Sequence, residues 1–167
     1  MAIAANALGL KGLVVLLADG RSYSRALMRS MLSQLEIKAI HEAVDGAAAI
    51  DVICAVNPDV MIVDWDLPIL NVRDVLRMVR TSSAIPNSNL PVIVVSSSGQ
   101  SADVHDAIKL GAQQFMIRPI SPKMLEQRLR SIVQAALRAA RSYNIEAPRP
   151  REEPETLDSH WQVLEGR

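Results

Sequence analysis

Four side chains that can do chemistry stand directly after strand-like apolar runs. Asp19 and Asp64 each follow a run rich in Val, Leu and Ile; Ser96 follows a third, and Arg118 a weaker one. Two carboxylates held together repel each other, which favours a hard divalent cation such as Mg²⁺. A hydroxyl and a cation opposite them can hold an anion such as a phosphoryl group. The set therefore predicts phosphoryl transfer to a carboxylate, with an aspartyl phosphate as the product.

The four positions meet if the runs are parallel strands of one sheet. Five strands are predicted from apolar runs at residues 14–17, 37–41, 60–63, 92–95 and 114–117. Helical spacing predicts helices at 26–35 after an N-cap at Ser22, then at 47–56, 72–79, 102–110 and 121–141. This alternation predicts an α/β fold, a doubly wound five-stranded parallel sheet with five helices, which binds ligands at the carboxyl ends of its strands.

Length and composition limit the function. The 167 residues suit one domain over 12–141, between an N-terminal arm (1–11) and a flexible acidic tail (142–167). Eighteen basic residues balance eighteen acidic ones, so no strong field attracts nucleic acid or an anionic membrane. The lone Cys54 falls on the apolar side of its helix, which predicts a buried thiol in a reducing compartment. The apolar runs are too short to span a bilayer, so we expect a cytoplasmic protein.

From about Gly12 to Val133 the sequence resembles the CheY-like receiver domains of two-component response regulators. Residues 58–68, Pro-Asp-Val-Met-Ile-Val-Asp-Trp-Asp-Leu-Pro, resemble the phosphoacceptor segment. Residues 16–19, 90–96 and 111–119 are similar to the acidic first-strand motif, the fourth strand with its switch hydroxyl, and the last strand. The resemblance implies Asp64 as phosphoacceptor, Ser96 and Phe115 as switch residues, Arg118 in place of the site's lysine, and Mg²⁺ held near Asp19, Asp64 and Asp66.

Three positions depart from the family pattern. Gly20 stands where a second acid commonly ligates the metal, so we expect weakened Mg²⁺ binding, with Asp66 as a compensating ligand. Arg118 carries its charge on a longer planar fork, which can clamp Asp64 and Asp19 directly and stand in for metal. Val72 replaces the glycine expected past the acceptor, which predicts a different loop shape. We interpret the site as degenerate but not abolished.

The resemblance implies a single-domain response regulator rather than an enzyme. Asp64 would accept a phosphoryl group from a sensor histidine kinase or a phosphotransfer protein, and signalling would follow by protein contact. The alternative is a pseudo-receiver that acts as a phosphorylation-independent adaptor, which Gly20 and Arg118 favour. The long apolar stripe of the last helix, reaching Leu137 and Ala140, and the apolar tail residues near Trp161 predict a homodimer contact or docking of the tail.

Overall fold

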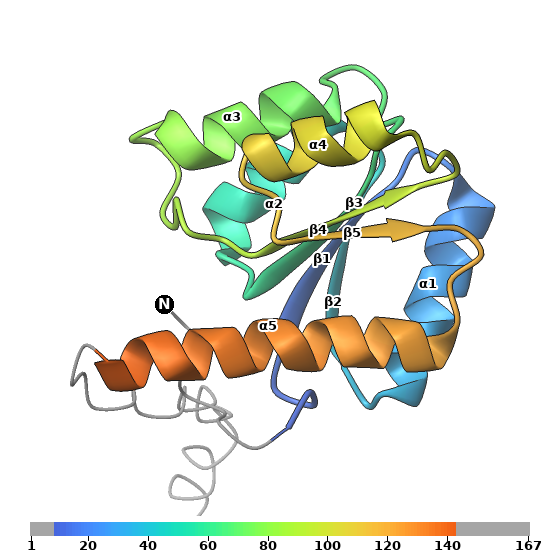
Figure 1. Ribbon diagram of the computed structural model, residues 1–167, viewed down its shortest axis with the longest axis vertical. Coiled ribbons are helices and arrows are strands. Elements are labelled where there is room, and N and C mark those ends of the chain that lie inside the picture. Colours follow the sequence, from blue (N-terminus) through green and yellow to red (C-terminus); the bar gives the residue numbers. More distant parts are fainter. Residues whose placement is uncertain (1–8, 143–167) are drawn as a thin grey trace, which may run out of the picture.

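Strands and helices alternate throughout the chain segment that the computed structural model describes, residues 9–142 (Figure 1). The strands are β1 (Val14–Ala18), β2 (Ala39–Ala43), β3 (Val60–Asp64), β4 (Val92–Ser96) and β5 (Gln114–Ile117). The helices are α1 (Ser22–Gln34), α2 (Gly46–Val56), α3 (Val72–Thr81), α4 (Ser101–Lys109) and α5 (Pro122–Ser142). Each element predicted from the sequence is present.

The five strands form one parallel sheet in the order β2-β1-β3-β4-β5. Helices α1 and α5 cover one face of the sheet, while α2, α3 and α4 cover the other (Figure 1). The strand order reverses at β1, which lies between β2 and β3. In such a sheet the crevice at this reversal point lies outside the carboxyl ends of β1 and β3. The fold is the doubly wound five-stranded parallel sheet with five helices that the sequence predicted.

The central strands are apolar throughout because both faces of the sheet are covered. All residues of β3 and β4 are buried. Successive residues of a strand point to opposite faces, so Met61 packs in the cluster beneath α2 and α3, and Ile62 in the cluster beneath α1 and α5. Two filled cores therefore hold the strand ends rigidly in place.

Some boundaries differ from those predicted. The second strand begins at Ala39 rather than residue 37, and Ile37 is a buried residue in the turn before it. Helix α1 begins at Ser22, so Arg21 rather than Ser22 occupies the N-cap position, where its side chain makes no capping hydrogen bond. Helix α4 ends at Lys109, and Gly111 just beyond it has a φ of 93°, the left-handed conformation that glycine favours after a helix.

Two predictions about burial change with the structure. Cys54 is exposed, so the prediction of a buried thiol was wrong. Helix α2 buries Ala49 and Ile53, which are four residues apart on one stripe, and Cys54 lies one position further around the helix. Leu10, assigned to the N-terminal arm, is buried in the core beneath α1 and α5. Residues 1–8 of the arm and the tail from 143 lie outside the described residues.

The apolar stripe of α5 covers the core for most of its length. Leu125, Leu129, Ile132 and Val133 are buried, and Ala136 and Leu137 pack half-buried against the same cluster. The side chain of Ala140 is outside the described part of the chain. Much of the stripe therefore has a partner within the domain, and the homodimer stays a prediction. No helix within residues 9–142 has the length and apolar character needed to cross a membrane.

Candidate functional site

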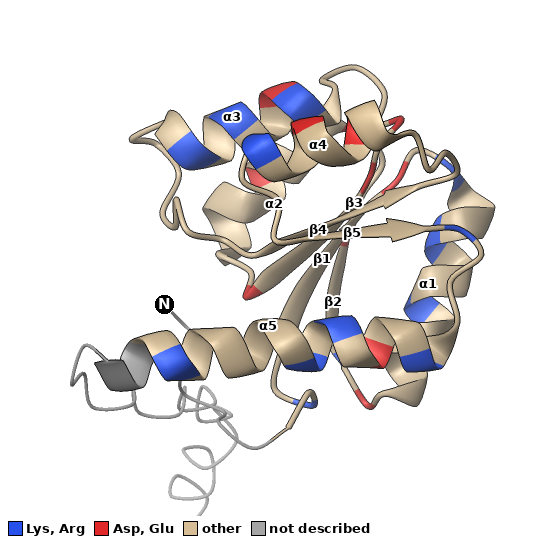
Figure 2. Cartoon of the chain, viewed as in Figure 1, with Lys and Arg blue, Asp and Glu red and all other residues tan. Residues whose placement is uncertain are grey.

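Asp19 and Asp64 come together at the carboxyl ends of β1 and β3. The two strands are paired, with Ala18 opposite Val63, so the next residue of each strand is a carboxylate at the same edge. Both acids are buried, with 2% and 3% of their surfaces exposed. Figure 2 shows this acidic edge beside basic residues on α1 and on the segment after β5. Two buried carboxylates need positive charge close by.

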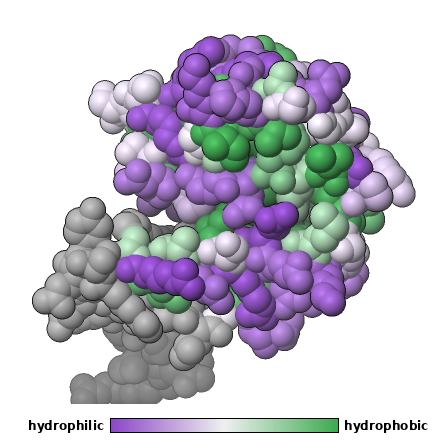
Figure 3. Space-filling model, viewed as in Figure 1, coloured by the Kyte–Doolittle hydropathy of each residue, from purple (hydrophilic) through white to green (hydrophobic). Residues whose placement is uncertain are grey.

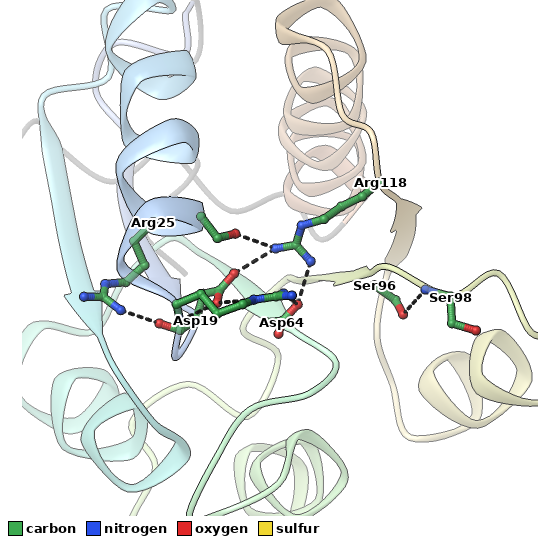
Figure 4. A network of polar contacts seen from close by, with 8 residues as sticks. Asp19, Arg25, Asp64, Ser96, Ser98 and Arg118 are labelled. Carbon is green, nitrogen blue, oxygen red and sulfur yellow. Dashed lines mark hydrogen bonds and ion pairs between the residues drawn. The ribbon is translucent and has the colours of Figure 1, made fainter.

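Arg118, the residue after β5, supplies part of that charge (Figure 4). Its Nη1 donates to Asp64 Oδ1 at 2.7 Å, and its Nη2 donates to Asp19 Oδ2 at 2.7 Å. Nη2 also donates to Ser24 Oγ at 2.8 Å. The Arg118 backbone N–H donates to the carbonyl of Ser96, which fixes the start of the side chain beside β4. Arg118 thus clamps both carboxylates directly, as predicted from its planar fork.

A second guanidinium, from Arg21, contacts the same two acids. Nη2 of Arg21 donates to Asp64 Oδ1 at 2.8 Å, and Nε lies 3.3 Å from Asp19 Oδ1. The Arg21 backbone N–H donates to the same Asp19 oxygen at 2.9 Å. No sequence pattern assigned a role to Arg21. A cation two residues after a predicted site acid was the available signal, but only the turn before α1 directs it inward.

The same surroundings shift the pKa values of the two carboxyls in opposite directions. For Asp19, burial raises the pKa, but hydrogen bonds from Ser24 and the Arg21 backbone and the charges of both arginines outweigh burial, so the pKa is lowered. For Asp64, burial is the largest effect, and together with the charge of Asp19 it outweighs the bond from Arg118 and the nearby charges, so the pKa is raised. The ionised form of Asp64 is therefore less stabilised by its surroundings than that of Asp19, and Asp64 is the more basic carboxylate.

Asp64 has one oxygen occupied and one open. Both guanidinium bonds fall on Oδ1, and no side chain or backbone donor within residues 9–142 bonds to Oδ2. An unbonded carboxylate oxygen keeps its lone pairs available for attack on an electrophile. The site therefore holds a positioned nucleophile beside two cationic groups.

The remaining predicted residues lie around this centre. Ser96, at the end of β4, is fully buried. Its hydroxyl oxygen accepts a hydrogen bond of 3.0 Å from the backbone N–H of Ser98 (Figure 4). Phe115 is half-buried and meets Trp65 edge-on, with ring centroids 6.0 Å apart. Asp66 is exposed, and its charge acts on Arg21. The structure thus joins Asp19, Asp64 and Arg118 by direct bonds, while Ser96 bonds elsewhere.

Comparison with known proteins identifies the family. The family model of the response regulator receiver domain matches residues 15–130. This chain belongs to the response regulator receiver family. The chemotaxis protein CheY1 of Helicobacter pylori is 30% identical over 121 residues, which cover 71% of this chain and 95% of CheY1. The CheY homolog of Campylobacter jejuni is 28% identical, covering 71% of this chain and 91% of the homolog.

Solved structures share the fold of this receiver. The receiver domain of sensor histidine kinase PA1611 from Pseudomonas aeruginosa, described with a magnesium ion in its active site cleft, has a TM-score of 0.66 at 20% identity, covering 74% of this chain and 98% of that one. The Francisella response regulator 1452 receiver domain has a TM-score of 0.67 at 24% identity, covering 75% and 99% of the two chains.

The residues of this receiver do not fit a divalent metal as they are arranged. Mg²⁺ needs oxygen ligands that are free to coordinate it. Both oxygens of Asp19 and Oδ1 of Asp64 already accept bonds from two arginines, and Gly20 offers no side-chain oxygen, so Oδ2 of Asp64 is the one carboxylate oxygen of this pair that no described donor bonds. Within residues 9–142 no three His, Cys, Asp or Glu side chains are grouped to hold a metal. Two features therefore disfavour Mg²⁺ binding at this site: the acid that is missing at Gly20, and the Arg21 guanidinium bonded to the two carboxylates.

The loop after the acceptor explains two of the departures. A Cβ added at Gly20 would lie 3.0 Å from Cδ and Cγ of Pro68, so the small residue and the proline ring pack closely together. Asn71 caps α3 by accepting from the Asp74 backbone N–H, and Val72 is simply the first residue of that helix. The positive φ of this loop, 65°, falls on Ile69 instead. No positive φ is therefore needed at Val72.

Proposed function

We propose that this receiver accepts a phosphoryl group on Asp64 from a phosphohistidine of a sensor kinase or phosphotransfer protein, and signals by protein contact. The observation that carries the proposal is the buried Asp64 carboxylate, with Oδ1 held by Arg118 and Arg21 and Oδ2 open. The protein is then a phosphoacceptor rather than an enzyme with a small-molecule substrate. A cytoplasmic location and the homodimer stay predictions.

The transfer step needs only a positioned nucleophile and charge neutralisation. A carboxylate oxygen of Asp64 forms a bond to phosphorus as the phosphorus–nitrogen bond of the donor breaks. The imidazole nitrogen keeps the electron pair of that bond and takes up a proton. Arg118 can follow the developing charge from the carboxylate to the phosphoryl oxygens, because its fork presents several donors. The Ser96 hydroxyl can rotate from Ser98 to donate to the same group.

A groove next to the site suits the helix that would carry the donor histidine. It has a volume of about 460 Å³ and lies between α1 and the segment that joins β5 to α5. Leu27, Met28, Met31 and Ile120 give it an apolar lining, and Arg118 lies at its site end. An amphipathic helix lays its apolar face into such a groove. We therefore assign this groove to the phosphodonor.

The surface that changes on phosphorylation and contacts a target protein would be the face formed by α4, β5 and α5. Trp65 directly follows the acceptor and contacts Phe115 of β5, and the centroid of its ring lies 4.3 Å from the guanidinium carbon of Arg73. Arg73 in turn pairs with Asp103 of α4 at 3.5 Å. Apolar side chains over α4 and β5, flanked by polar surface, include the half-exposed Ile108 and Ile117 (Figure 3). A charge change at Asp64 can bias the position of α4 through these contacts.

Labelling of the full chain tests the proposal. The protein is incubated with a phosphorylated histidine phosphotransfer protein and, separately, with acetyl phosphate, and the modified residue is mapped by mass spectrometry after reductive trapping of the acyl phosphate. We expect one phosphoryl group on Asp64, lost in Asp64→Asn. Asp66→Asn, which alters the exposed acid two residues away, should keep the label.

Two results would count against the proposal. Absence of label from every donor would favour the phosphorylation-independent adaptor, and label on a residue other than Asp64 would show that the acceptor was misassigned.

A further inference from the structure

We propose that the Arg21 guanidinium takes the place of the divalent cation in this receiver, so that Asp19 and Asp64 are neutralised without metal. The inference rests on the proposed function only in that it concerns the same site. It can be tested on the unphosphorylated protein, independently of any phosphotransfer.

The position of Arg21 among the acids is the main evidence. The three residues that the sequence predicted as metal ligands, Asp19, Asp64 and Asp66, all act on this one side chain. Two of them bond or pair with it directly, at 2.8 Å to Asp64 and 3.3 Å to Asp19. Burial lowers the pKa of Arg21, but the charges of Asp64, Asp19 and Asp66 outweigh burial and raise it. The guanidinium thus lies within bonding distance of both carboxylates that the sequence predicted as metal ligands.

Charge balance points the same way. The two buried carboxylates carry two negative charges, and Arg21 and Arg118 carry two positive ones. A divalent ion entering this set meets a neutral centre instead of an anionic one, and it must first displace a bonded guanidinium. The two arginines therefore cancel most of the Coulomb attraction that Asp19 and Asp64 would exert on a hard cation.

The geometry of the turn at Gly20 and Arg21 supports the replacement of the metal ion by the Arg21 guanidinium. Gly20 allows the chain to pass close to the Pro68 ring, and the backbone N–H of Arg21 is bonded to Asp19. These contacts fix the start of the Arg21 side chain beside the acids. The turn at residues 20–21 thus has glycine in place of a metal-binding acid and places a positive charge, that of Arg21, beside the two carboxylates.

Magnesium titration tests the proposal. Trp161→Phe leaves Trp65 as the only tryptophan, next to Asp64, and its fluorescence is followed as MgCl₂ is added at constant ionic strength. In this background we expect Arg21→Gln to bind Mg²⁺ at least about tenfold more tightly than the unmodified Arg21 protein, because a unit positive charge is removed a few ångströms from the ion. Mg²⁺ should also raise the melting temperature of Arg21→Gln more than that of the Arg21 protein.

Two further variants complete the test. Arg77→Gln removes an exposed arginine that pairs with Asp74 on α3, and it should titrate like the Arg21 protein. Arg21→Lys keeps the charge and should bind Mg²⁺ no better than the Arg21 protein. Equal Mg²⁺ affinity with and without Arg21, no binding by Arg21→Gln, or tight binding by Arg21→Lys would each overturn the proposal. None of these outcomes depends on whether Asp64 is phosphorylated, so the proposed function stands or fails separately.

Discussion

Replacing Arg118 by methionine should destabilise the folded protein markedly. Arg118→Met keeps much of the side-chain length but removes three hydrogen bonds, at 2.7, 2.7 and 2.8 Å. Two of these go to carboxylates that are almost fully buried, while the Arg118 side chain itself is 23% exposed. The loss leaves two buried acids with Arg21 as the only other side chain paired with both of them in the described part of the chain.

The expected magnitude follows from these contacts. Removing one partner of a buried ion pair costs about 3–5 kcal/mol. Partial exposure of Arg118 and the remaining contacts of Arg21 reduce this figure, so we expect a loss of about 2–4 kcal/mol in the free energy of unfolding at neutral pH. That loss is a large fraction of the stability of a domain of this size.

Urea unfolding, followed by Trp65 fluorescence in the Trp161→Phe background and by circular dichroism, measures the change. The slope of the free energy against urea should not change, because the surface exposed on unfolding is the same. Adding Asp19→Asn to Arg118→Met should restore at least about 1 kcal/mol, since one uncompensated buried charge is then gone.

A surface arginine provides the control. Arg130→Met breaks an exposed pair with Glu126 on α5 and should change stability by less than about 0.5 kcal/mol. If Arg118→Met fell in the same small range, or if Asp19→Asn gave no recovery, the idea that Arg118 neutralises two buried acids would be refuted.

Two other predictions concern the groove and the pH dependence. Leu27→Arg, at a half-exposed position of the groove, should slow phosphotransfer from a histidine donor protein at least about tenfold, whereas Ile108→Arg on α4 should not slow it; equal rates in both variants would place the donor elsewhere. Because the pKa of Asp19 is lowered on folding, this residue stabilises the folded protein above the ordinary Asp pKa of 3.8, and that stabilisation is lost as the pH falls through the folded pKa. Because the pKa of Asp64 is raised on folding, ionisation of this residue costs the folded protein stability as the pH rises from 3.8. At neutral pH Asp19→Asn should therefore be less stable than wild type and Asp64→Asn more stable, with both differences shrinking toward acid in urea unfolding; differences of the same sign would contradict the assignment.

The fold could be read from the sequence because its signals are local and repeated. Uninterrupted runs such as that at 92–95 occur where both faces of a strand are covered, and helical spacing separates them. Polar residues directly after those runs then had to share the carboxyl edge of the sheet. The order of strands and polar residues along the chain therefore predicts that Asp19, Asp64 and Arg118 lie at one edge.

Cys54 and the second strand show where local patterns fail. Cys54 stands on a helix that is apolar almost all round, so the pattern did not define which stripe faces the sheet. Ile37 is apolar and buried, yet it belongs to the turn before β2, since burial alone does not require a strand. Such details depend on how neighbouring elements pack, and a single chain segment does not contain that information.

The sequence by itself determined the parallel sheet, its edge of acids and the arginine that spans them, because strand periodicity and chain order fix which residues lie at that edge. Only the tertiary structure decided the direction of Arg21, to which no sequence pattern assigned a role. Its course depends on a glycine that fits against Pro68 and on two carboxylates contributed by separate strands. Electrostatic contacts between residues far apart in the chain set that choice, and they exist only once the strands have paired.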